Sequence, residues 1–119
     1  MRIKAFAEAL NLRLLTDQPD GSDISVSGCY LGDLLSNVMA KVKEGDLWMT
    51  VVTNQNVVAV AHLMNVPAVV FLEGHQPMPE TLERGNSEKI PLFSSEESAY
   101  GMAVRFHRFL PEAEGEGMP

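Results

Sequence analysis

The sequence predicts an α/β fold, a three-layer α/β/α sandwich in which helices cover both faces of one partly parallel, mixed sheet. Two continuous apolar runs, Leu47–Val52 (LWMTVV) and Pro67–Leu72 (PAVVFL), are typical of strands buried on both faces. The segment Gln55–Met64 between them is long enough for a helix of about three turns. A strand, a helix and a strand in this order form a crossover unit, which places the two strands in parallel.

The first elements follow from helical spacing and then from alternation. Apolar residues at helical spacing predict a helix over Arg2–Leu10, and a short strand is expected over Leu12–Thr16. The turn formers of Asp17–Asp23 (DQPDGSD) predict a surface loop. Alternating apolar and small residues then predict a strand over Ile24–Tyr30.

A second helix is expected before the first buried run, packed through one apolar face and stopped at Gly45. Its apolar residues at helical spacing are Leu34, Leu35, Val38, Met39 and Val42.

Three more elements follow the second buried run. Pro79 at a first-turn position and nearby acidic residues predict a helix over Pro79–Arg84. A short strand is expected over Ile90–Phe93. A serine cap followed by acidic residues then opens a last helix, which Pro111 ends.

The chain length and composition indicate a single folded domain. The 119 residues are 45% hydrophobic and 21% charged, an ordinary globular mixture. We expect one domain over residues 1–110. Residues 111–119 (PEAEGEGMP) are expected to form a flexible acidic tail, because they are too polar and glycine-rich to bury a surface.

Charge and composition exclude several partner classes. The formal net charge of −7 disfavours binding to nucleic acid or to an anionic membrane. Cys29 is the single cysteine, so no internal disulfide is expected, and His62, His75 and His107 lack metal-ligand spacing. The sequence therefore predicts no metal site and no cofactor. It also lacks a signal peptide and an apolar run of roughly 18 residues, so we expect a cytoplasmic protein.

Three loops that follow predicted strands carry polar side chains. In a parallel α/β sheet, ligands lie outside the carboxyl ends of the strands, next to helix N-termini. The loops therefore predict a binding site for a small polar ligand or nucleotide, or a contact patch. The candidate residues are Thr53, Asn54, Gln55, Asn56, His75, Ser94 and Ser95.

A purely structural role competes with this prediction. Thr53 or Asn54 could cap one helix, and Ser94 or Ser95 another, although one cap does not account for three adjacent carboxamides. His62, inside an apolar helix, is expected to be a hydrogen-bonded core or interface residue.

Two further candidates lie in the GCYLGDLL stretch. Tyr30 is either a contact residue or a residue at the edge of the core, and Asp33 is either a contact residue or a helix cap.

Catalysis is not indicated. The sequence has no GxSxG nucleophile motif and no GxxxxGK[ST] phosphate loop, so we expect no enzyme activity. Two alternatives remain open: a small enzyme or ligand sensor that uses the polar loops, and a structural subunit of a larger complex.

The stretch GCYLGDLLSNVMAKVKEGDLWMTVVTNQNVVAVAHLMNVPAVVFLEG, followed by a short strand ending in SS and a last helix, resembles the DRTGG-domain family. Stand-alone members of that family are similar to the non-catalytic N-terminal domain of HPr kinase/phosphorylase. The resemblance spans Met1 to Phe109, although the sequence has TNQNV where the family has its DRTGG pentapeptide.

The resemblance implies a three-layer α/β/α fold like that N-terminal domain and a regulatory or interaction role. It also implies self-association, here as a homodimer, or a protein partner encoded by a neighbouring gene. It implies no kinase activity, because that activity belongs to a separate domain that contains a phosphate loop.

Overall fold

The computed structural model describes the backbone of residues 1–114 and the side chains of residues 1–110. Helices and strands alternate along most of this part of the chain. In order they are α1 (Ile3–Ala9), β1 (Arg13–Leu14), β2 (Gly28–Leu31), α2 (Leu35–Lys41), β3 (Asp46–Thr50), α3 (Asn56–Leu63), β4 (Val69–Phe71), α4 (Pro79–Ser87), β5 (Leu92–Ser94) and α5 (Ala99–Glu114).

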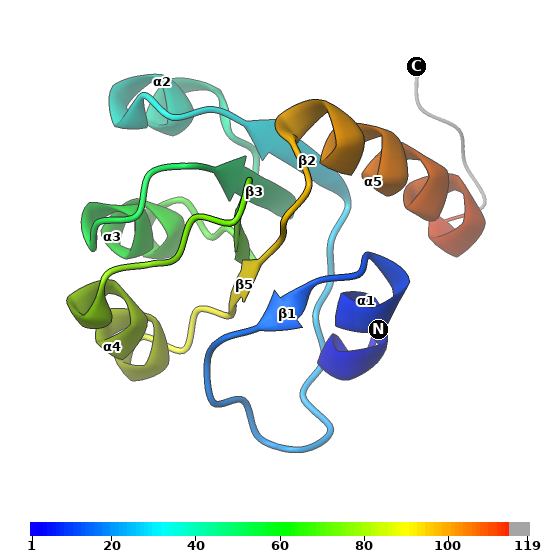
Figure 1. Ribbon diagram of the computed structural model, residues 1–119, viewed down its shortest axis with the longest axis horizontal. Coiled ribbons are helices and arrows are strands. Elements are labelled where there is room, and N and C mark those ends of the chain that lie inside the picture. The colour runs from blue at the N-terminus through cyan, green and yellow to red at the C-terminus, as the bar shows by residue number, and fades with distance from the viewer. Residues whose placement is uncertain (115–119) are drawn as a thin grey trace.

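The five strands form one mixed sheet in the order β1-β5-β4-β3-β2. Strands β2 to β5 are mutually parallel, and β1 is antiparallel to β5 at the opposite edge from β2. Helices α1 and α5 cover one face of the sheet, whereas α2, α3 and α4 cover the other (Figure 1). The predicted three-layer α/β/α sandwich with a partly parallel sheet is therefore confirmed.

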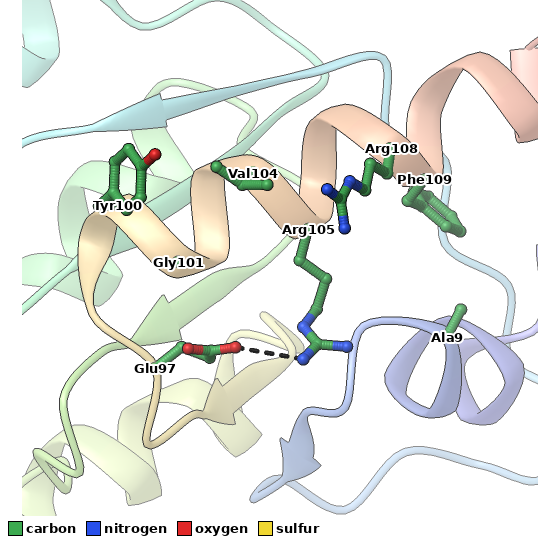
Figure 2. A pocket seen from close by; sticks show the side chains of 8 residues that line it. All are labelled: Ala9, Glu97, Tyr100, Gly101, Val104, Arg105, Arg108 and Phe109. Atoms are coloured by element: carbon green, nitrogen blue, oxygen red, sulfur yellow. Dashed lines mark hydrogen bonds and ion pairs between the residues drawn. The ribbon is translucent and has the colours of Figure 1, made fainter.

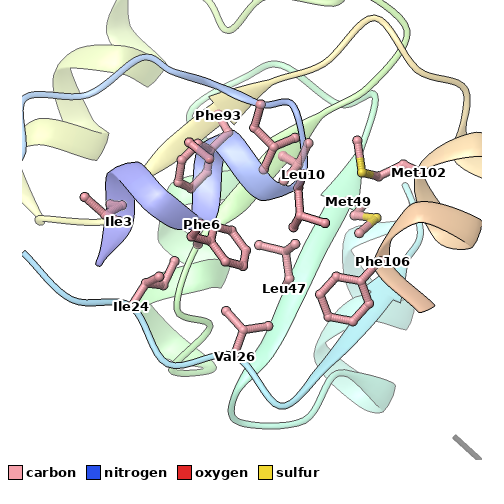
Figure 3. Close-up of a cluster of buried hydrophobic side chains, with 14 of the residues drawn as sticks. Ile3, Phe6, Leu10, Ile24, Val26, Leu47, Met49, Phe93, Met102 and Phe106 are labelled. Atoms are coloured by element: carbon pink, nitrogen blue, oxygen red, sulfur yellow. The ribbon is translucent and has the colours of Figure 1, made fainter. Parts of the chain in front are cut away.

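Each face of the sheet has its own hydrophobic core. The first core lies under α1 and α5 and includes Phe6 and Phe106 (Figure 3). The second lies under α2, α3 and α4. In β3, Leu47 and Met49 point into the first core and Trp48 into the second, all at 0% exposure. A strand that buries both faces has no polar alternation, which is why this run is continuously apolar.

The predicted strand Ile24–Tyr30 is wrong in its first half, because β2 begins only at Gly28. Ile24 and Val26 are buried in the first core, as their alternation suggests. However, the Ile24 N–H donates to the Met1 carbonyl oxygen at 2.7 Å rather than to a neighbouring strand of the sheet. The alternation reports which side chains are buried and does not identify the backbone partner.

The other predicted elements are present, with shifted ends. Helix α4 continues beyond Arg84 to Ser87. Helix α5 continues through Pro111 to Glu114, so the predicted stop at Pro111 is wrong. Proline favours a helix end without imposing one, and the following Glu-Ala-Glu are good helix formers. The rest of the expected tail, residues 115–119, lies outside the described residues.

Helix α2 packs less completely than its apolar pattern predicts. Val38 and Val42 are buried, but Leu34 and Met39 are 68% and 41% exposed. Leu31, at the end of β2, is also exposed. The open edge of the sheet therefore carries apolar side chains that neither core uses. No helix within residues 1–114 has both the length and the apolarity needed to cross a membrane.

Candidate functional site

The carboxyl ends of β2, β3, β4 and β5 meet at one edge of the sheet because these strands are parallel. We define the carboxyl edge as the loops that follow these strands, residues 32–34, 51–55, 72–78 and 95–98. Strand β1 runs the other way, so its first residue, Arg13, lies opposite Ser94 at this same edge. The three loops predicted from the sequence therefore lie on one side of the molecule.

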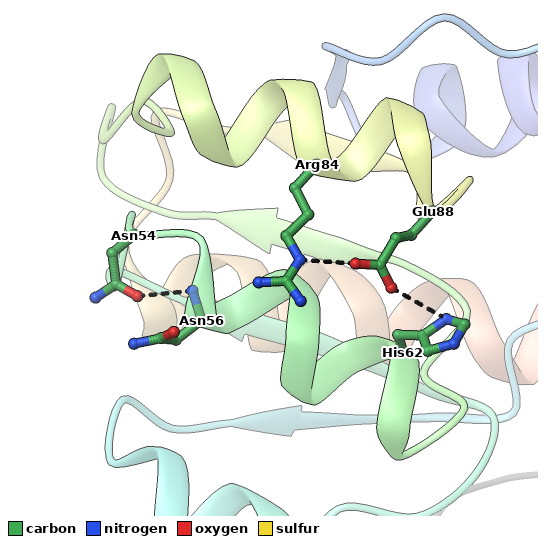
Figure 4. Close-up of polar contacts among 5 residues, drawn as sticks. All are labelled: Asn54, Asn56, His62, Arg84 and Glu88. Carbon is green, nitrogen blue, oxygen red and sulfur yellow. Dashed lines mark hydrogen bonds and ion pairs between the residues drawn. The ribbon is translucent and has the colours of Figure 1, made fainter.

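The loop before α3 uses part of its polarity for the fold. The Asn54 Oδ1 accepts a hydrogen bond from the Asn56 N–H at 2.9 Å, which closes the turn into α3 (Figure 4). The Thr53 carbonyl oxygen accepts from the Met78 N–H at 3.1 Å and the Thr81 hydroxyl at 2.7 Å. Gln55 and Asn56 are exposed. One carboxamide thus serves the helix start, and two are presented to solvent.

The loop after β4 is fixed to the loop after β5. Glu73 and Gly74 have φ values of 57° and 74°, and the His75 N–H donates to the Leu72 carbonyl oxygen, which closes a tight turn. The Glu73 N–H donates to the Glu97 carbonyl oxygen and the Gly74 N–H to that of Ser95, both at 2.9 Å. This pairing brings the exposed His75 close to the serine-containing loop.

The two candidate serines are buried, and neither caps α5. The Ser95 Oγ accepts from the Glu97 N–H at 3.0 Å. Ser98 is the residue whose Oγ accepts from the Gly101 N–H at 3.0 Å, at the start of the helix. The expected cap at Ser94 or Ser95 is therefore wrong, because α5 begins only at Ala99.

Asp33 connects two loops instead of capping a helix. Its Oδ1 accepts from the Thr50 hydroxyl at 2.8 Å and from the Val51 N–H at 2.9 Å. Tyr30 packs at the border of the second core, and its hydroxyl accepts from the Asn37 Nδ2 at 2.9 Å. Asp33 therefore reaches the carboxyl edge, whereas Tyr30 contacts α2.

Two hollows open at the carboxyl edge. One, of about 430 Å³, includes Ser94 and Ser95 together with Arg13, Gln76 and Glu96. The other, of about 260 Å³, lies between the ends of β2, β3 and β4 and includes Asp33 and Glu73. Thr53, Asn54, Gln55, Asn56 and His75 line neither hollow. Of the candidate residues, Ser94, Ser95 and Asp33 thus line a hollow, and the others lie outside both hollows.

The carboxyl edge is acidic. Asp33 and Glu73 line the smaller hollow, and Glu96 and Glu97 line the larger one, where Arg13 is the basic side chain. Free phosphate groups would meet net repulsion here. A neutral or positively charged polar molecule fits this electrostatic environment better.

A surface cluster joins the C-terminal ends of α3 and α4 (Figure 4). The Arg84 Nε lies 2.7 Å from the Glu88 Oε2, and the His62 Nδ1 lies 3.5 Å from the Glu88 Oε1. The hydrogen bond from Arg84 lowers the pKa of Glu88. His62 is exposed and lies close to Glu88, so the core alternative of its expected position is wrong, and the interface alternative stays a prediction.

Arg13, Gln76 and Glu96 are edge residues that the sequence did not identify. Arg13 could not be identified from the sequence, because it reaches this edge through the antiparallel pairing of β1 with β5, which no local pattern encodes. Gln76 and Glu96 belong to loops that were identified, but nothing distinguished them there. Within the described residues, no group of three or more His, Cys, Asp and Glu side chains is arranged to hold a metal ion.

No protein-family model matches the sequence, and no curated protein matches it either. A solved structure with a similar fold is the regulatory region of Clostridium perfringens pyrophosphatase, which contains CBS and DRTGG domains and was solved with its activator, diadenosine tetraphosphate. The TM-score is 0.62 at 12% sequence identity. The match covers 87% of this chain and 44% of the other, so this chain spans less than half of that region. The fold is thus shared with a region that contains a DRTGG domain, in agreement with the resemblance seen in the sequence.

Proposed function

We propose that this chain is a non-catalytic, cytoplasmic regulatory module of the DRTGG type that binds a small polar ligand at the carboxyl edge. The observation that carries the proposal is the pair of hollows at that edge, lined by polar side chains on loops that backbone hydrogen bonds fix together. The similar fold of a regulatory region supports a regulatory role.

The contacts of Ser95 and His75 favour binding over catalysis. A nucleophilic serine needs a base within hydrogen-bond distance. The Ser95 hydroxyl is buried and is engaged with the Glu97 N–H, and the exposed His75 does not line the hollow that contains Ser95. The small-enzyme alternative therefore has no support from this arrangement.

The ligand class follows from the charges at the edge. The similar regulatory region was solved with a dinucleotide activator, so nucleotides belong in any ligand screen. The acidic lining of both hollows favours a neutral or cationic ligand with hydroxyl or amine groups, because these donate to carboxylates.

Two variants test the site. Gln76→Ala and Glu96→Gln alter exposed side chains of the larger hollow, so both proteins should fold normally. They should lose the stabilisation that a bound ligand gives in a thermal-unfolding assay. Ser87→Ala, at the C-terminal end of α4 and outside the hollow, is the matched surface control and should keep the ligand stabilisation. If both edge variants retain full ligand stabilisation, the ligand does not bind in this hollow.

We also propose that the module forms a homodimer through its open sheet edge. Leu31, Leu34 and Met39 are exposed beside β2, whose outer side has no strand partner in the described part of the chain. A second copy would cover these side chains. Sedimentation should show a dimer that Leu34→Asp converts to a folded monomer. A wild-type monomer at micromolar concentrations would contradict this proposal and leave room for a different protein partner.

A further inference from the structure

A groove of about 650 Å³ lies between α5 and α1, beside the loop that leads into α5 (Figure 2). We call it the α1–α5 groove and define it by Glu97, Tyr100, Arg105, Arg108 and Phe109, with Ala9 of α1 as the facing wall. Its volume falls within the range of about 300–1,000 Å³ that is common for small-molecule sites.

The groove lies on the side of α5 that the core does not use. Met102, Phe106 and Leu110 form the buried stripe of this helix. Tyr100 and Arg108 are two steps of four residues apart, so they lie on one stripe of the helix. Both are exposed, so this stripe differs from the buried one. Gly101 deepens the groove between them: a Cβ atom at this position would lie 2.6 Å from the Glu97 Oε1.

The lining is more basic than the protein as a whole. Arg105 and Arg108 face one acid, Glu97, so the lining carries a charge of 2 − 1 = +1 in a chain of net charge −7. The Arg105 Nη2 lies 3.1 Å from the Glu97 Oε2, an ion pair that orients the guanidinium (Figure 2). The Arg105 Nε is buried and has no acceptor among the described residues. A preoriented arginine beside a second, exposed arginine is suited to an anionic group.

Aromatic rings lie at both ends of the groove. Tyr100 is 81% exposed, and neither core includes it. Phe109 is half-buried and is held by an edge-to-face contact with Phe6, with ring centroids 5.6 Å apart. A fixed aromatic wall and an exposed tyrosine offer flat surfaces against which a ring can stack.

We propose that the α1–α5 groove binds a small aromatic anion of nucleotide size, a nucleoside mono- or diphosphate. The phosphate would contact Arg105 and Arg108, and the base would stack on Tyr100. The helix rise separates residues 100 and 108 by about 12 Å, so the ligand must be elongated, with its ring and its charge at opposite ends. This site shares Glu97 with the larger hollow of the carboxyl edge, but its other lining residues are separate, and it does not depend on ligand binding there.

The test is calorimetric titration of the full chain with AMP and ADP. Arg108→Gln and Tyr100→Ser change exposed side chains, so both variants should keep the wild-type circular dichroism. Each should weaken nucleotide binding by about ten-fold, because each removes a charge-assisted contact or a stacking surface. Lys41→Gln, which removes an exposed positive charge of α2 outside both sites, is the matched control for charge and should bind as the wild type does.

Three results would overturn the proposal. The first is that neither nucleotide binds. The second is that Arg108→Gln and Tyr100→Ser bind as tightly as the wild type. The third is that Arg13→Gln loses binding while Arg108→Gln keeps it, which would place the nucleotide at the carboxyl edge and leave the ligand-binding role proposed above intact. Inorganic phosphate should compete only weakly, since it lacks the ring.

Discussion

The carboxamides of residues 54–56 divide between the fold and the surface. The Asn54 side chain closes the turn into α3, while the Asn56 side chain is exposed at the first helical position. Asn54→Ala removes this turn-closing hydrogen bond and should therefore lower the free energy of unfolding by about 1 kcal/mol. Asn56→Ala should leave it within about 0.5 kcal/mol of the wild type. Urea denaturation measures both values, and a larger loss for Asn56→Ala would reverse these assignments.

Cys29 should be poorly reactive in the folded protein. Burial, followed by the nearby charge of Asp46, raises the pKa of its thiol from 9.0 to about 11. A rise of this size leaves about a hundredfold less thiolate at neutral pH, and the thiolate is the reactive form. Iodoacetamide should accordingly label Cys29 far more slowly in buffer than in denaturant.

The raised pKa of Cys29 also predicts how the stability of the fold changes with pH. The folded state favours the protonated thiol, so this contribution is complete below pH 9 and is lost as the pH rises towards 11. Cys29→Ser should remove most of that alkaline loss of stability. Equal labelling rates in the folded and unfolded chain would contradict the burial of this thiol.

At the scale of elements, the positions of strands are predicted best when both faces of the strand are buried. Strands β3 and β4 were located from continuous apolar runs, since both of their faces lie in a core. The start of β2 was misplaced because Ile24 and Val26 are buried without pairing into the sheet. The antiparallel direction of β1 depends on a long-range pairing with β5, which local spacing does not encode.

The contact between α4 and β5 provides a further test. Gly85 is buried in α4, and a Cβ atom there would lie 2.6 Å from the Leu92 Cδ1. Gly85→Ala should therefore destabilise the domain by about 1–3 kcal/mol through overpacking, which outweighs the gain of about 1 kcal/mol in helix propensity. The control is Ser87→Ala, an exposed position in the same helix. A stabilised Gly85→Ala protein would show that α4 moves away from β5 at little cost.

At the scale of the whole molecule, the sheet brings together loops that are far apart in sequence. The loops at Glu73 and Ser95 were predicted to share one edge, and the structure joins them through two backbone hydrogen bonds. The lining of the larger hollow was not fully predictable, because it includes Arg13, which the antiparallel pairing of β1 with β5 brings to this edge. The α1–α5 groove was also not predicted, because its residues in α5 lie outside the buried stripe of that helix and match no binding motif.

The most direct test of the regulatory role is a thermal-unfolding screen of the purified chain against amines, amino acids, polyols and nucleotides. A ligand at about 100 times its dissociation constant adds about 2.7 kcal/mol, which raises the midpoint by on the order of 10 °C for a domain of this size. If the chain has a non-catalytic regulatory role, at least one ligand should give a saturable rise and be recovered chemically unchanged after incubation. A flat response to every ligand, or conversion of the bound ligand to a product, would contradict it.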